Sequence, residues 1–110
     1  MAISARTTDP IAASLDCLRG HLPPGSRVIV FGSQARGEAR DDSDLDLLVV
    51  EPEVHNRFDE MARLASLLGR QLIPADVVVM SDEAFEQECT QPNTLAWRAT
   101  REGRVHAFPR

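Results

Sequence analysis

The sequence predicts a mixed α/β (α+β) fold, in which a small mixed sheet of about three main strands is flanked by helices. Three short runs of branched aliphatic residues, at 27–31, 45–50 and 76–80, supply the strands. Around them, apolar residues recur at helical spacing behind helix-capping residues. A chain of 110 residues has room for one domain with a hydrophobic core, which we expect to span residues 1–110.

The first helix is predicted to begin after Asp9, an N-cap that is followed by proline at the first helical position. Apolar residues then recur at helical spacing: Ile11, Leu15, Leu18 and Leu22. The Pro-Pro-Gly run at 23–25 ends this helix, and the strand at 27–31 follows. The next turn opens a short helix or loop that reaches Gly37.

The second strand is followed by a helix that Asn56 caps. Its apolar face is predicted to cover the sheet and contains Phe58, Met61, Leu64, Ala65 and Leu68. After the third strand, Ser81 caps a helical segment that reaches about Glu88. A last helix runs over about 93–102, and residues 104–108 follow it as a short extended tail.

Polar residues gather where two predicted strands end. Gly32-Ser33 follows the first strand, and ten residues later Asp44-x-Asp46 opens the second. Side chains two apart on a strand lie on one face, about 6.6 to 6.8 Å apart, so the two aspartates share a site. The helical crossover to the third strand favours parallel pairing, which brings Asp76 to the same end of the sheet.

Three carboxylates so close would repel one another by on the order of 4 kcal/mol per pair at 4 Å. A divalent cation relieves this repulsion, and Mg²⁺ is usually held by one or two carboxylates together with substrate phosphates. Beside this cluster, Gly32 lets the backbone approach a phosphate, and a helix start would offer free N–H groups to it.

These motifs resemble those of the DNA polymerase beta-like nucleotidyltransferase superfamily, and are most similar to its minimal nucleotidyltransferase branch. The resemblance implies that Asp44 and Asp46 bind two Mg²⁺ ions and that Asp76 helps to hold the ion that activates an acceptor hydroxyl. It also implies that Gly32 and Ser33 hold the phosphates of ATP. Arg36 would neutralise the leaving pyrophosphate.

Family members of this branch are antitoxins encoded beside a HEPN-type ribonuclease toxin, whose tyrosine they adenylylate. The resemblance therefore implies transfer of AMP from ATP to a hydroxyl group of a partner. Formation of an oligomer with that partner is left as an open possibility. Two alternatives also stay open: an antitoxin that neutralises its partner by contact alone, and a nucleotidyltransferase acting on an aminoglycoside-like small molecule. The last helix, with Leu95 and Trp97, is the candidate docking surface.

Composition limits the other classes of function. The net charge of −5 argues against direct nucleic-acid binding, because phosphate backbones are held mainly by clustered basic residues. No apolar run approaches a membrane span, and the first residues lack the core of a signal peptide, so we expect a cytoplasmic protein. Cys17 and Cys89 show no metal-binding spacing.

Overall fold

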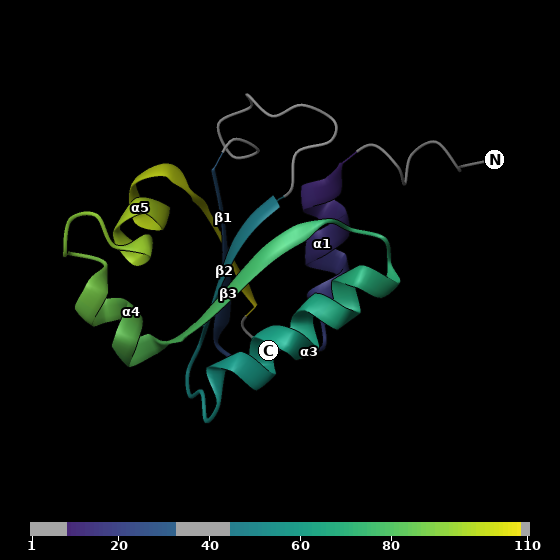
Figure 1. The fold of residues 1–110 in the computed structure, drawn as a ribbon, viewed down its shortest axis with the longest axis horizontal. Coiled ribbons are helices and arrows are strands. Elements are labelled where there is room, and N and C mark those ends of the chain that lie inside the picture. The colour runs from purple at the N-terminus through teal and green to yellow at the C-terminus, as the bar shows by residue number, and fades with distance from the viewer. Residues whose placement is uncertain (1–8, 33–44, 109–110) are drawn as a thin grey trace.

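A computed structural model describes residues 9–32 and 45–108 of the chain (Figure 1). Four strands form one sheet in the order β3-β2-β1-β4. Their bounds are Ser26–Phe31 for β1, Leu45–Glu51 for β2, Ala75–Ser81 for β3 and Arg104–Phe108 for β4. β1 is antiparallel to β2 and β4, whereas β2 is parallel to β3, as the helical crossover between them predicts. The mixed α/β fold class is confirmed.

The sequence predicts residues 104–108 to be an extended tail, whereas in the structure they form the fourth strand. This segment pairs with β1 over five residue pairs, from Ser26 opposite Phe108 to Val30 opposite Arg104. Without it, the outer edge of β1 would expose a row of unpaired backbone groups. The segment therefore completes the sheet.

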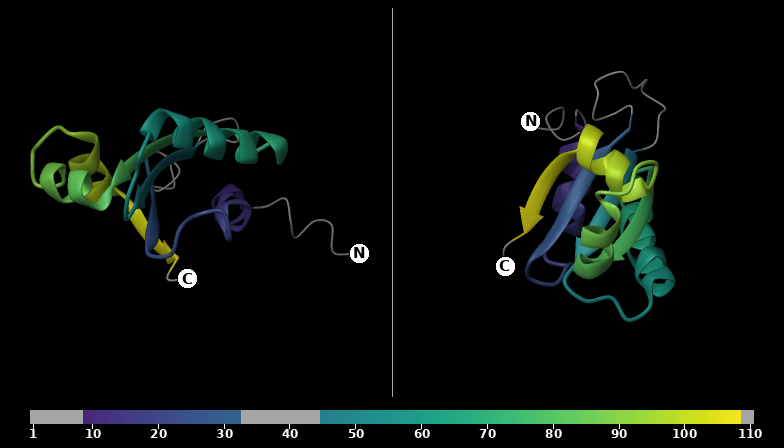
Figure 2. Two further views of the ribbon diagram at one scale, coloured as in Figure 1. Left: turned by 90° about the horizontal axis from the view of Figure 1, so that it is seen from below. Right: turned by 90° about the vertical axis from the view of Figure 1, so that its left-hand side faces the viewer.

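Two pairs of helices lie at opposite ends of the molecule (Figures 1 and 2). They are α1 (Pro10–Leu18) with α3 (Arg57–Arg70), and α4 (Asp82–Glu88) with α5 (Leu95–Glu102). The predicted caps are observed: Asp9 accepts from the Ile11 N–H, Asn56 from the Phe58 and Asp59 N–H groups, and Ser81 from the Ala84 N–H. α5 begins one residue after its N-cap Thr94. No helix in the two described ranges is both long enough and apolar enough to cross a bilayer.

Both faces of the sheet are covered. α1 and α3 pack on one face with the odd-numbered residues of β2, and α4 and α5 pack on the other with Leu48 and Val50. Leu47, Leu48, Val49 and Val50 are all fully buried, so β2 is a continuous apolar run rather than an alternating one. Asp46, an even-numbered residue, lies on the face of α4 and α5.

The apolar face of α3 is narrower than predicted. Leu64 and Leu68 are buried and Met61 is half-buried, but Phe58 is 72% exposed and Ala65 is exposed. At 3.6 residues per turn, Phe58 and Ala65 lie roughly 100° or more around the helix from Leu64. They therefore lie outside the stripe that meets the sheet.

Candidate functional site

Two of the predicted carboxylates lie side by side. Asp46 is the second residue of β2 and Asp76 the second residue of β3, and the parallel register places their Cα atoms opposite each other. Neighbouring strands lie about 4.8 Å apart, and residues in register point to the same face of the sheet. Asp46 is half-buried and Asp76 is exposed, so the pair opens to solvent on the side of α4 and α5.

Gly32 backs directly onto this pair. It directly follows β1 with φ of +81°, and its neighbour Phe31, the last residue of that strand, is paired with Asp46. A Cβ at this position would lie 3.1 Å from the Asp46 Cγ and would overlap the carboxylate oxygen Oδ2. Glycine is required here for two reasons: the backbone is left-handed, and the Asp46 carboxylate lies too close for a side chain. The predicted phosphate-binding turn thus begins against a predicted metal-binding carboxylate.

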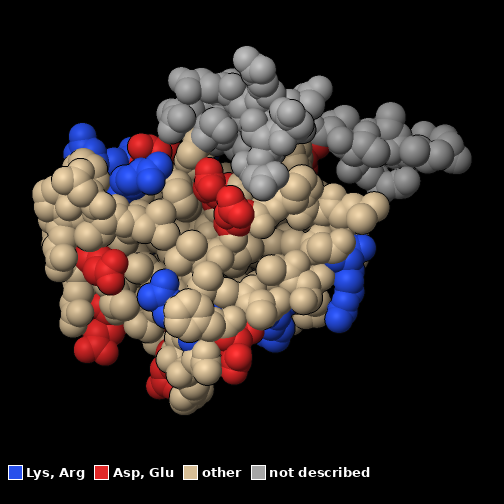
Figure 3. Space-filling model, in the orientation of Figure 1, with Lys and Arg blue, Asp and Glu red and all other residues tan. Residues whose placement is uncertain are grey.

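Three predicted site residues, Ser33, Arg36 and Asp44, lie outside the described residues. Within 9–32 and 45–108, no three His, Cys, Asp or Glu side chains form a group that could hold a metal ion. Asp46 and Asp76 supply two carboxylates of the kind that Mg²⁺ accepts, and the Asp76 side chain is exposed to solvent. Figure 3 shows acidic side chains, in red, at the surface next to the atoms drawn in grey.

The last helix offers less free apolar surface than predicted. Leu95 is half-buried and packs against the core formed with α4. Trp97 is half-buried, and the Arg101 guanidinium lies 4.9 Å from the centre of its ring. This contact favours a packing role for Trp97, because a stacked guanidinium already covers part of the indole.

A second group of charged side chains lies at the opposite end of β2, and sequence reasoning missed it. Glu51 is 4% exposed, and burial with the neighbouring Glu60 raises its pKa to about 8. The Arg63 guanidinium, bonded to both Glu60 oxygens at 2.7 and 2.8 Å, lowers the pKa of Glu60 to about 2. Arg63 also donates to the His21 carbonyl at 2.8 Å. Glu51 is an even number of residues from Leu45 and Leu47, so its side chain lies on the same face of β2, the face that α3 covers. This alternation could have indicated its burial.

The family described as "Nucleotidyltransferase domain" matches residues 14–96. Among curated proteins, no match was found. A solved toxin–antitoxin crystal structure with AMP-PNP shares the fold, with 21% identity, a TM-score of 0.52 and coverage of 83% of this chain and 67% of that chain.

Two further solved structures are similar. A candidate nucleotidyltransferase from Sulfolobus solfataricus is 26% identical, with a TM-score of 0.51 and coverage of 78% of each chain. A candidate minimal nucleotidyltransferase is 33% identical over 99% of this chain and 93% of that chain, with a TM-score of 0.46. The family match over most of the chain supports the assignment drawn from the motifs. The chain belongs to the nucleotidyltransferase domain family.

Proposed function

We propose that this protein transfers AMP from ATP to a hydroxyl group of a partner protein, with Mg²⁺ as the cofactor. The observation that carries the proposal is the register of β2 and β3, which pairs Asp46 with Asp76 beside the Gly32 turn in a nucleotidyltransferase. Paired carboxylates next to a backbone that can approach phosphates suit in-line displacement at phosphorus.

Each site residue has an assigned role in this proposal. Asp44 and Asp46 hold two Mg²⁺ ions, and Asp76 adds a ligand to one of them. The bound ions would supply charge neutralisation at the phosphates and a more acidic acceptor hydroxyl. Gly32 and Ser33 hold the triphosphate, and Arg36 neutralises the departing pyrophosphate.

If the acceptor is a tyrosine, it belongs to another protein, because this sequence contains no tyrosine. We assign a tyrosine of a HEPN-type ribonuclease toxin, which makes this chain a cytoplasmic antitoxin of one domain. The shared fold with a toxin–antitoxin structure that contains AMP-PNP supports this assignment, since that structure holds a toxin–antitoxin together with a nucleotide analogue.

Intact-mass analysis tests the proposal. The protein encoded by the adjacent gene is purified and incubated with this chain, ATP and Mg²⁺, and a mass increase by one or more AMP units is expected on that protein alone. Asp46→Asn should abolish the shift and keep the fold, because it removes a metal ligand and relieves repulsion between carboxylates. Asp59→Asn, a change of the same chemistry at an exposed position on α3, is the control and should leave the shift intact.

The result separates the alternatives. Neutralisation of the partner by an Asp46→Asn variant that transfers nothing would favour an antitoxin acting by contact. Transfer to an aminoglycoside-like small molecule and to no protein would favour the small-molecule enzyme. Transfer by Asp46→Asn at the wild-type rate would remove Asp46 from the catalytic site.

A further inference from the structure

Leu72 combines two unfavourable features at one position. Its side chain is 89% exposed, the most exposed of the three large apolar side chains that the structure describes at the surface. Its backbone is left-handed, with φ of +59°, and only one other described residue that is not glycine, Asn93, has a positive φ. A leucine in this conformation crowds its own backbone, so the position would be more stable with glycine or asparagine.

The turn that ends α3 explains how Leu72 is held outward. The Leu72 N–H donates to the Gly69 carbonyl and the Ile73 N–H donates to the Leu68 carbonyl, each at 3.0 Å. These two bonds form a Schellman motif with Leu72 at the position that glycine usually occupies. Leu68 is buried and Ile73 packs on the same core, so the motif is anchored on both sides and presents Leu72 to solvent.

Leu72 lies at the same end of the sheet as the paired carboxylates. Three residues separate it from Asp76, which limits the distance between their Cα atoms to about 14 Å. The connecting segment is fastened to β2, because the Leu45 N–H donates to the Pro74 carbonyl at 3.2 Å. An interface of ordinary size centred on Asp76, with a radius of roughly 16 Å, would therefore reach Leu72.

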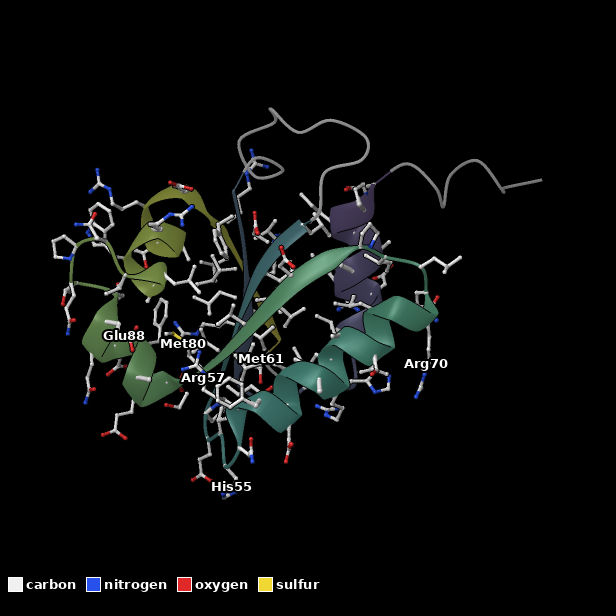
Figure 4. All side chains as sticks on the ribbon, in the orientation of Figure 1. His55, Arg57, Met61, Arg70, Met80 and Glu88 are labelled. Carbon is white, nitrogen blue, oxygen red and sulfur yellow. The ribbon has the colours of Figure 1, made fainter. Side chains whose placement is uncertain are left out.

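The surroundings of Leu72 define the chemistry of an occupant. Arg70 is exposed, points away from the sheet in Figure 4, and forms no ion pair with another described residue. Next to Leu72 in sequence, Arg70, Gln71 and Ile73 line one side of a groove of about 870 Å³ between α1 and α3, and Asp9, Asp16 and Arg19 line the other side. In a chain of net charge −5, an unpaired cation beside an exposed leucine is complementary to an apolar pocket with a carboxylate at its rim.

We propose that Leu72 and Arg70 form the docking surface for the acceptor protein, which covers Leu72 with an apolar pocket and faces Arg70 with an acidic residue. This inference rests on the proposed transfer to a partner protein. It moves the docking surface from α5 to the end of α3, because Leu95 and Trp97 are already engaged in packing. The exposed leucine would be an interface anchor whose cost to the free protein is offset in the complex.

Leu72→Gly separates docking from folding, since glycine relieves the left-handed strain while it removes the side chain. We expect its melting temperature to equal or exceed that of the wild type. We expect the dissociation constant for the separately purified protein of the adjacent gene, measured by calorimetry, to rise at least about tenfold. Arg70→Glu should weaken the same binding. The thermal shift with ATP and Mg²⁺ should be unchanged in both variants.

Phe58→Ala is the matched control. Phe58 is 72% exposed and lies at the start of α3, about 20 Å along the helix from the end that Leu72 follows. It should bind as the wild type does. Wild-type binding by Leu72→Gly, or no binding of that protein by the wild type, would overturn the docking surface. Self-association of the wild type that Leu72→Gly abolishes would assign the surface to a second copy instead. Tight, Leu72-dependent binding without AMP transfer would refute the proposed reaction and leave the docking surface standing.

Discussion

Replacing Glu51 with glutamine tests the buried charges at the end of β2. Glu51 is 4% exposed, and its Oε2 has no hydrogen-bond partner among the described residues. Its pKa is raised to about 8, mainly by burial and then by Glu60, whereas Glu60 itself stays ionised through Arg63. Glu60 and Arg63 are the charged groups that act on Glu51, since Glu53 and His55 of the next loop are exposed. At pH 7, Glu51 therefore carries a proton.

The sign of the pH dependence follows from the raised pKa. Between the ordinary value of 4.5 and about 8, the folded protein binds more protons than the unfolded chain. The contribution of Glu51 to the unfolding free energy is fully present below pH 4.5, is lost as the pH rises through this window, and is constant above about 8. At about 1.4 kcal/mol per pKa unit, the loss is up to roughly 5 kcal/mol. Glutamine keeps the shape of the protonated acid and does not titrate.

Urea denaturation at pH 5, 7 and 9 measures this effect. The unfolding free energies of the wild type and Glu51→Gln should be similar at pH 5, and the variant should become the more stable by a few kcal/mol at pH 9. Glu53→Gln removes an exposed carboxylate from the adjacent loop and should follow the wild type. A difference between wild type and Glu51→Gln that stays constant from pH 5 to 9 would refute the assignment of a proton to Glu51.

Two further predictions concern the candidate site. Gly32→Ala should lower the unfolding free energy by at least about 1 to 2 kcal/mol, because the new Cβ meets the Asp46 carboxylate and the backbone is left-handed; an unchanged midpoint in thermal unfolding would contradict that contact. Mg²⁺ and ATP should raise the melting temperature only when added together. The cation takes its remaining ligands from the triphosphate, and the triphosphate needs the cation to offset its repulsion by the carboxylates. Ser33→Ala and Arg36→Ala should reduce this rise without removing it, and an equal rise with ATP in chelator would argue against a metal-dependent site.

Much of the fold could be predicted from local sequence because the signals act over a few residues. Asp9, Asn56 and Ser81 cap their helices through neighbouring N–H groups, and each was identified from the residues that follow it. The pairing of Asp46 with Asp76 was also predictable, since a helical crossover almost always joins parallel strands.

Other features depend on contacts that local sequence does not encode. The segment at 104–108 becomes a strand because the edge of β1 is open to it, more than seventy residues earlier in the chain. Leu72 is exposed because the turn after α3 takes the Schellman form although its glycine position holds a leucine. Neither outcome follows from the propensities of the residues involved.

The two acidic residues of β2 show why position in the sequence alone does not reveal which carboxylate can reach a ligand. Asp46 and Glu51 stand near opposite ends of one apolar run and, being five residues apart, point to opposite faces of the sheet. Asp46 stays half-exposed beside Asp76, where a cation can neutralise it, whereas Glu51 is covered by α3 and is neutralised by a proton. What covers each carboxylate therefore decides whether it is available to a ligand or fixed in the core. The sequence motif predicted a site role only for the first, because a glycine turn and a second strand accompany it.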